Sequence, residues 1–205
     1  MKPIQKSLLF LSVIFVSCQP AVRSNFGLYR WKAQTLDGQM IDFSSLNTRA
    51  LVLNFYSPTC GPCVDEIPAL KEFYTTVQKK GGTMYLVLER KPDANGLTLP
   101  TSASDQSVFE ATRDRMKQDL LKYGISIPVV IMDRQFDIRQ DGSTLISGTP
   151  ETLFIRTKPL ILEYNFIGPI STAKNLTDLT RDTRYQFALK KLDELVQENA
   201  SAYQE

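Results

Sequence analysis

The chain has 205 residues, with 24 Lys and Arg against 22 Asp and Glu, three Cys and no His. This near balance of charge excludes the basic surplus with which proteins bind nucleic acid, so no nucleic-acid partner is predicted. The length suits one domain with a sizeable core.

Residues 1–17 have the plan of a signal peptide, with a charged start at Lys2 and Lys6 and an apolar core from Ser7 to Val16. The core has ten residues and is too short to cross a bilayer as a permanent helix. We therefore expect this segment to direct export. Its removal would leave 22 basic and 22 acidic residues, a net charge of zero.

Cys18 follows the small residue Ser17, an arrangement that resembles a bacterial lipoprotein signal. The resemblance implies that Cys18 becomes the lipidated first residue and that residues 18–25 form a tether to the membrane. Phe15 departs from the pattern, which has an aliphatic residue at that place. The alternative is an ordinary signal peptide in which Cys18 is incidental. The expected location is the periplasmic or cell-surface side.

The next predicted elements are a hairpin, a strand and a helix. Asp37-Gly38 is a strong turn signal between Trp31–Leu36 and Met40–Phe43. The apolar run Leu51–Tyr56 indicates a buried strand. Apolar residues at helical spacing follow from Val64 to Val77, so we expect a helix close behind this strand.

Further along, the chain continues to alternate between apolar runs and helical patterns. A polar loop follows the next strand and is either a lid that faces the substrate or a surface insertion. The order of elements predicts an α/β fold with a central mixed sheet and helices on both faces. The elements are a strand Met84–Leu88, the loop Lys91–Asp105, a helix Gln106–Tyr123, a strand Val129–Met132, an irregular or briefly helical stretch Phe136–Ser147, paired strands Thr152–Ile155 and Leu160–Ile167, and a final helix Thr180–Gln197.

The motif Cys60-Gly61-Pro62-Cys63 lies where the predicted strand is followed by the helix. The thiolate is the nucleophile in disulfide exchange, and the free N–H groups and dipole of a helix N-terminus stabilise a negative sulfur. Pro62 suits the first helical turn because its missing N–H has no partner there. We predict that Cys60 attacks and that Cys63 is the buried resolving thiol, a redox-active disulfide that needs no other cofactor.

Three other uses of the cysteine pair fit less well. Half of a zinc site would need two more ligands, and the chain has no His and only one other thiol, Cys18, so no metal is predicted. A static disulfide across a two-residue loop would constrain the unfolded chain little. A c-type haem needs a His directly after Cys63, where Val64 stands.

With these motifs in order, the chain resembles the thioredoxin superfamily and is most similar to the membrane-anchored TlpA/ResA-like thiol–disulfide oxidoreductases of the redoxin group. The resemblance implies a thioredoxin-like domain over residues 26–199, with an N-terminal hairpin extension and a tail at 200–205. It rests on the hairpin, Asn54-Phe55-Tyr56, the Cys motif, Glu66-Ile67-Pro68 and Gly148-Thr149-Pro150.

The resemblance also implies roles for single residues. Pro150 matches the family's cis-proline, which faces the cysteine pair, and the Thr149 backbone would pair with an extended substrate segment. Gly61 and Pro62 would complete the substrate-binding surface between the cysteines. The alternative for Pro150 is a trans proline that opens a strand.

Glu66 matches an acid that lies beneath the cysteines in this group and moves their protons. A buried carboxyl has a raised pKa and can act as a general base. The alternative is an acid that favours the first helical turn through the dipole alone, as expected of Asp65. Asn54 stands where thioredoxin has a buried Asp, and Asn cannot titrate, so Glu66 is the expected proton carrier.

We therefore predict an exported thiol–disulfide oxidoreductase, a reductase kept reduced by a transmembrane electron donor and acting on protein thiols and disulfides. Cytochrome c maturation or maintenance of exported thiols is implied by the resemblance. One alternative is a peroxiredoxin-like thiol peroxidase, although Asn54 and Phe55 stand where that spacing needs Pro and Thr or Ser. The other alternative is a non-enzymatic surface lipoprotein.

Overall fold

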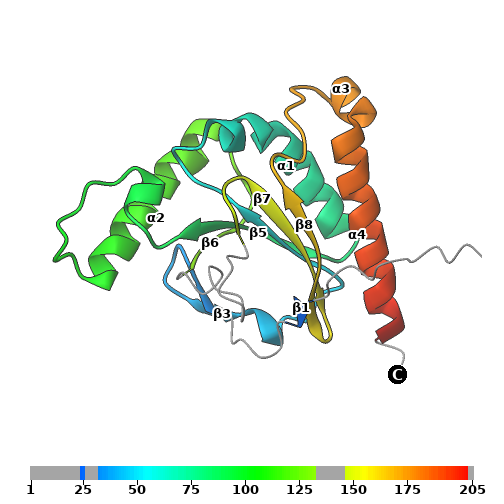
Figure 1. Ribbon diagram of the computed structural model, residues 1–205, viewed down its shortest axis with the longest axis horizontal. Helices are drawn as coiled ribbons and strands as arrows, with labels where there is room; N and C mark the ends of the chain where they lie inside the picture. The colour runs from blue at the N-terminus through cyan, green and yellow to red at the C-terminus, as the bar shows by residue number, and fades with distance from the viewer. Residues whose placement is uncertain (1–23, 26–31, 133–145, 203–205) are drawn as a thin grey trace, which may run out of the picture.

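The computed structural model describes residues 24–25, 32–132 and 146–202 (Figure 1). In these residues, no helix is both long enough and apolar enough to span a membrane. Several predicted features lie outside the described residues: the signal peptide, Cys18, most of the tether, Trp31 and most of the 136–147 stretch.

One mixed sheet of eight strands forms the centre of the protein, in the order β1-β8-β7-β4-β5-β6-β2-β3. The pairs β4–β5 and β5–β6 are parallel, and the other neighbours are antiparallel. The predicted thioredoxin-like class, with a mixed sheet and flanking helices, is confirmed. The strands are β1 (Ser24–Asn25), β2 (Lys32–Thr35), β3 (Met40–Asp42), β4 (Leu51–Phe55), β5 (Thr83–Glu89), β6 (Val129–Met132), β7 (Glu151–Thr157) and β8 (Leu160–Ile167).

The predicted hairpin is present as β2 and β3, with Lys32 opposite Asp42. Its turn contains Gly38 at φ 85°, a conformation that residues with a side chain rarely adopt. β2 also pairs with β6, so the hairpin extends the central sheet along that edge.

The helices are α1 (Gly61–Lys79), α2 (Asp105–Tyr123), α3 (Leu176–Arg181) and α4 (Thr183–Ala202), with short 3₁₀ turns η1 (Phe43–Ser45) and η2 (Asp93–Asn95). Contrary to the expectation of helices on both faces, all the described α-helices pack against one face of the sheet (Figure 1). The crossovers β4–α1–β5 and β5–α2–β6 advance in the same direction along the sheet. Because parallel crossovers are right-handed, both helices lie on the same side.

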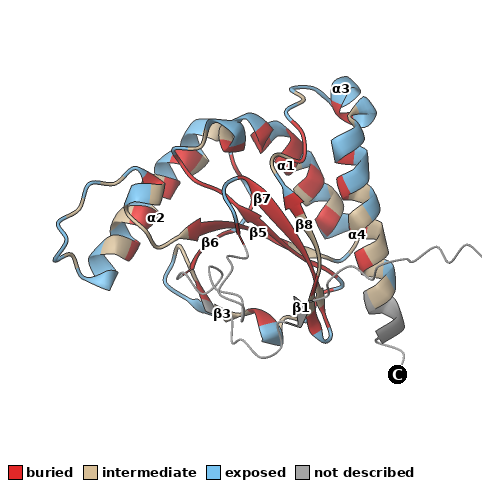
Figure 2. Cartoon of the chain, viewed as in Figure 1, coloured by how far each residue is buried: buried red, intermediate tan, exposed pale blue. Residues whose placement is uncertain are grey.

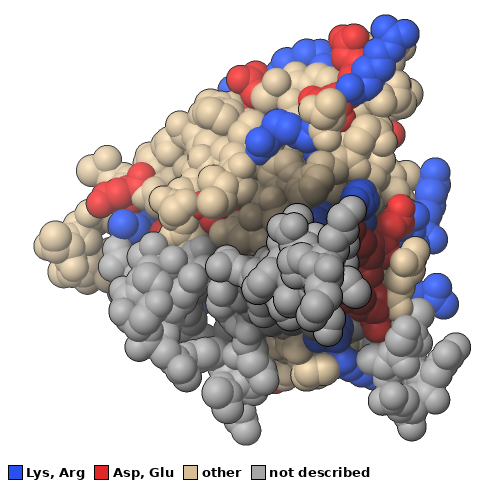
Figure 3. Space-filling model, turned by 45° about the vertical axis from the view of Figure 1, so that its right-hand side comes forward, with Lys and Arg blue, Asp and Glu red and all other residues tan. Residues whose placement is uncertain are grey.

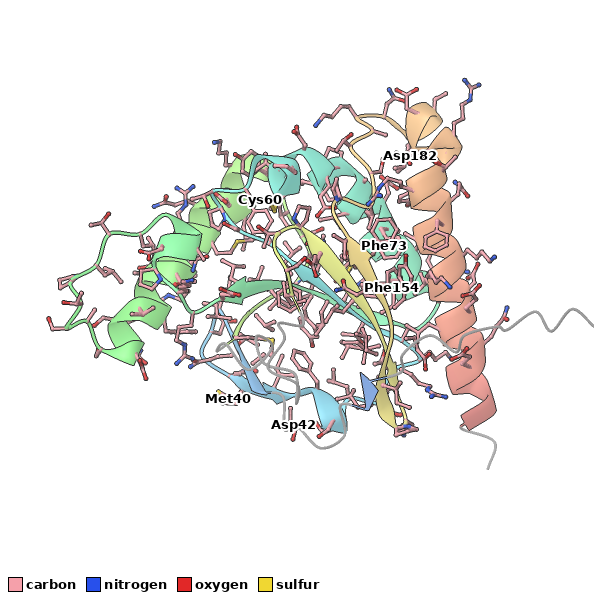
Figure 4. All side chains as sticks on the ribbon, viewed as in Figure 1. Met40, Asp42, Cys60, Phe73, Phe154 and Asp182 are labelled. Carbon is pink, nitrogen blue, oxygen red and sulfur yellow. A yellow bond between two sulfur atoms is a disulfide. The ribbon has the colours of Figure 1, made fainter. Side chains whose placement is uncertain are left out.

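The strands in the middle of the sheet are mostly buried (Figure 2). Their side chains contribute to two cores, one on each face of the sheet. On the helical face, Phe73 of α1 meets Phe154 of β7 edge-on, with ring centroids 6.0 Å apart (Figure 4). On the other face, Leu53 and Val87 pack with Phe43 of η1. These cores fix α1, and with it the residues at its N-terminus, against the middle of the sheet.

The predicted final helix is divided at Asp182 into α3 and α4 (Figure 4). The Asp182 carboxylate accepts hydrogen bonds from the backbone N–H groups of Arg184 (2.8 Å) and Tyr185 (3.2 Å). These contacts satisfy free donors at the start of α4, so a local capping residue interrupts an otherwise continuous helical pattern.

Candidate active site

Cys60 lies at the N-terminus of α1, directly beyond the carboxyl end of β4 (Figure 4). It is the N-cap residue, and its Sγ accepts from the backbone N–H of Cys63 at 3.1 Å. Its carbonyl accepts from Val64 N at 3.2 Å, and Pro62 occupies the first turn. A negative charge on Cys60 Sγ would therefore face free N–H groups and the positive end of the helix dipole.

Cys60 and Cys63 form a disulfide with Cα atoms 5.3 Å apart. Cys63 is buried, whereas Cys60 is partly exposed, and its neighbours Gly61 and Pro62 are exposed. Only Cys60 is within reach of a large substrate, which suits the predicted order of an attacking and a resolving thiol.

The loop before β7 faces the disulfide. The Thr149–Pro150 peptide bond is cis, as predicted, and the Thr149 carbonyl oxygen lies 3.3 Å from Cys60 Sγ. Gly148 and Thr149 are exposed and Pro150 is buried. Exposed residues of this loop thus lie beside the Cys60 sulfur.

Glu66 lies one turn after Cys63 on the buried side of α1 and is fully buried. Its Oε1 accepts from Asn54 Nδ2 at 3.0 Å and its Oε2 from the Ile170 N–H at 2.9 Å. Burial raises the pKa of the Glu66 carboxyl to about 7, although both donors and the charge of Arg184 favour ionisation. The predicted burial of Glu66 is confirmed, and a carboxyl with such a pKa can exchange protons near neutral pH.

Exposure distinguishes the two acids at the start of α1, the buried Glu66 and its neighbour Asp65. Asp65 is exposed and pairs with Lys174 at 2.8 Å, so it is a surface residue. Asn54, from the middle of β4, also donates to Thr152 Oγ1 at 2.9 Å, and its Oδ1 is buried without a hydrogen-bond partner among the described residues. Asn54 therefore orients the Glu66 carboxylate from the sheet.

Glu151 is a further site residue that the sequence patterns did not indicate. It is buried beneath the cis-proline loop, and its Oε1 accepts from the N–H groups of Ser147 (2.9 Å) and Gly148 (3.0 Å) and from the Ser147 hydroxyl. Its Oε2 accepts from Asn165 Nδ2 at 2.9 Å. The carboxylate thus holds the loop that presents the Thr149 carbonyl. The signal for it was an acid immediately after the proline at the start of an apolar strand.

The charged side chains drawn in Figure 3 do not form a surface of one sign. On the face drawn in Figure 3, Lys and Arg are interspersed with Asp and Glu, and neither sign covers the visible surface. In the part of the chain that the structure describes, no three His, Cys, Asp or Glu residues are grouped as metal ligands would be.

Comparisons with known proteins agree with this geometry. The model of the AhpC/TSA family matches residues 28–158, well over half of the chain. No curated protein is significantly similar to the chain in sequence.

Several solved structures share the fold. A secreted thiol–disulfide isomerase from Corynebacterium glutamicum is 16% identical, with a TM-score of 0.50 over 82% of this chain and 84% of that one. A candidate thiol:disulfide interchange protein DsbE from Chlorobium tepidum is 18% identical, with a TM-score of 0.51 over 79% and 92%. A candidate protein disulfide isomerase from Bacteroides thetaiotaomicron is 14% identical, with a TM-score of 0.54 over 85% and 91%. At these identities the likeness establishes the thioredoxin-like fold.

The family match covers the hairpin, the cysteine pair and the cis-proline. The chain therefore belongs to the AhpC/TSA family, and its fold is thioredoxin-like.

Proposed function

We propose that this protein is an exported, lipid-anchored reductase of protein disulfides. The observation that carries the proposal is the position of Cys60, at a helix N-terminus and 3.3 Å from the carbonyl oxygen of the exposed residue Thr149. A substrate strand that pairs with the Thr149 backbone would bring its disulfide to the Cys60 sulfur.

The reaction needs two thiol–disulfide exchanges. In the reduced protein, the Cys60 thiolate attacks one sulfur of the substrate disulfide, which forms a mixed disulfide and releases the other sulfur as a thiolate. Cys63 then loses its proton and attacks Cys60, which releases the second substrate thiol and leaves the Cys60–Cys63 disulfide. Two electrons pass to the substrate, and Glu66 is the nearby group that can take the Cys63 proton.

The reducing direction is supported by the Gly-Pro dipeptide between the cysteines, which resembles that of reducing members of the superfamily. A reductase in an oxidising compartment needs a continuous supply of electrons, so the proposal includes a transmembrane donor. Apocytochrome c cysteines or misoxidised exported proteins are the proposed substrates.

The reduction potential of the Cys60–Cys63 couple tests this direction. In the chain from residue 19 onward, equilibrated in defined thiol buffers, we expect a value near about −270 mV, as in thioredoxin. A value towards about −120 mV would instead make the protein a donor of disulfides. Absence of a reversible two-electron couple would remove the proposal altogether.

A thiol peroxidase is the second candidate because it uses the same thiolate. The sequence offers it less support, since Asn54 and Phe55 stand where the peroxidase spacing needs Pro and Thr or Ser. Rapid turnover of hydrogen peroxide by the reduced protein, far above the slow reaction of any thiolate, would favour the peroxidase.

The lipid anchor is tested separately at Cys18. We expect the full chain to remain with the membrane fraction and the Cys18→Ser chain to be recovered without a lipid, because the acyl chains would be attached to this sulfur. Fractionation and intact-mass measurement after expression in a bacterial host check this. Equal masses for the two mature chains, apart from the substitution, would show that Cys18 is not modified.

A further inference from the structure

The loop Lys91–Asp105 contacts the segment that leads into Cys60. Ser57 Oγ donates to the Ala94 carbonyl at 2.5 Å, and Thr59 Oγ1 donates to the same oxygen at 3.3 Å. The two hydroxyls are 2.9 Å apart, and Ser57 Oγ also accepts from Thr59 N at 3.2 Å. One carbonyl therefore holds both residues on the approach to the reactive cysteine.

The Ala94 carbonyl is itself held firmly by its neighbour. Asn95 is almost fully buried, and its Nδ2 donates to the carbonyls of Glu89 (2.7 Å) and Lys91 (2.9 Å). The same group lies 3.4 Å from Thr112 Oγ1 on α2. The η2 turn is thereby fixed to β5 on one side and to α2 on the other.

The fit between this turn and Thr59 is tight. Gly96 has φ +64°, and a Cβ built on it would lie 2.7 Å from Thr59 Cγ2. Side chains at this position would meet the Thr59 methyl group as well as an unfavourable backbone conformation. The contact thus includes van der Waals packing in addition to the two hydrogen bonds.

A second connection joins α2 to Tyr56, the first residue of the segment that leads into Cys60. The Tyr56 hydroxyl donates to Asp119 Oδ2 at 2.8 Å, and both side chains are buried. Burial and this hydrogen bond raise the pKa of the Tyr56 hydroxyl, so Tyr56 remains a donor. Residues 56–59 are therefore attached at both ends, Tyr56 to α2 and Thr59 to the η2 turn.

We propose that Thr59 is a positioning residue and that the η2 turn acts through it as a fixed brace for Cys60, rather than as a lid over the substrate. The segment 56–59 has little freedom between these attachments. It ends at Cys60, whose N–H donates to the Ser57 carbonyl at 3.1 Å. The brace holds Cys60 Sγ against the helix N-terminus and beside the Thr149 carbonyl. The proposal rests on the proposed redox function, because it assigns Thr59 an effect on the reactivity of Cys60.

The test compares Thr59→Val with Thr59→Ser in the reduced full chain. Valine keeps the size of the side chain but loses the hydrogen bond, so Cys60 should move more freely and its thiolate should be less stabilised. We expect alkylation of Cys60 by iodoacetamide at pH 7 to slow by about three- to tenfold, with the pH midpoint moved upward. Serine keeps the hydroxyl and should remain within about twofold of the unchanged chain.

Thr98→Val, in the exposed outer part of the same loop, is the matched control and should leave alkylation unchanged. Mass spectrometry of the Cys60 peptide separates its reaction from those of Cys18 and Cys63. An unchanged pH profile in Thr59→Val, or an equal loss in Thr59→Ser, would overturn the positioning role. Alkylation needs neither substrate nor electron donor, so this outcome is distinguishable from a failure of the proposed reductase.

Discussion

Replacement of Cys63 by Ser is expected to stop disulfide turnover while leaving the first chemical step intact. Cys60 remains partly exposed at the helix N-terminus, so it can still attack a substrate disulfide. Without the second thiol, the mixed disulfide has no internal route to release. We expect turnover to fall by at least about 10³-fold and a covalent substrate complex to accumulate.

The accompanying variant Cys60→Ser separates the roles of the two sulfurs. It should be equally inactive but should form no covalent complex, because Cys63 is fully buried and out of reach of a protein substrate. Non-reducing gel electrophoresis and mass spectrometry of the trapped species measure the difference. A complex that forms through Cys63 instead would reverse the assignment, and full function in both variants would support the non-enzymatic alternative.

The parts of this site that could be predicted from the sequence are those determined over short distances. The strand, the Cys motif and the helix that follows are neighbours in the chain, and the polar turn at Asp37-Gly38 needs only local geometry. Glu66 was placed beneath the cysteines by the family resemblance, and its position agrees with the rule that residues three apart share one side of a helix.

The features that were missed depend on contacts between distant segments. The local pattern makes Glu151 no more than the first residue of a strand, and only its burial beneath residues 147–148 shows that it holds the cis-proline loop. The attachment of Thr59 to Ala94 joins two loops that precede different helices. The side of the sheet on which α2 lies depends on the order of the strands, which local patterns do not specify.

Replacement of Glu66 by Gln is expected to slow release of the mixed disulfide by about 10²-fold, because the variant cannot take the proton of Cys63. The shape of the site should survive. The oxygen of the new side-chain amide can accept from the Ile170 N–H, and its NH₂ group can donate to Asn54 Oδ1, which has no partner among the described residues, once the Asn54 amide turns over. Asp65→Asn, which changes an exposed acid next to it, is the matched control and should retain activity.

The pKa of Glu66 also predicts how the rate of mixed-disulfide release changes with pH. Burial raises the pKa of Glu66 to about 7, so the basic carboxylate form becomes populated as the pH rises through about 7. The rate at which the mixed disulfide is released should therefore rise over this pH range in the unchanged chain. Glu66→Gln should lack this rise. Single-turnover release of a trapped substrate, measured between pH 5.5 and 8.5, distinguishes the two profiles.

The raised pKa of the Glu66 carboxyl also predicts how the stability of the folded chain depends on pH. The folded carboxyl keeps its proton at pH values where the unfolded chain, with a Glu pKa near 4.5, has already lost it. The folded state thus binds more protons between about pH 4.5 and 7, and its stability falls over this window by up to roughly 3 kcal/mol as the pH rises. Glu66→Gln removes this slope. If Glu66→Gln lost the slope in stability but kept the unchanged chain's pH profile for mixed-disulfide release, Glu66 would be a buried structural acid and another group would carry the Cys63 proton.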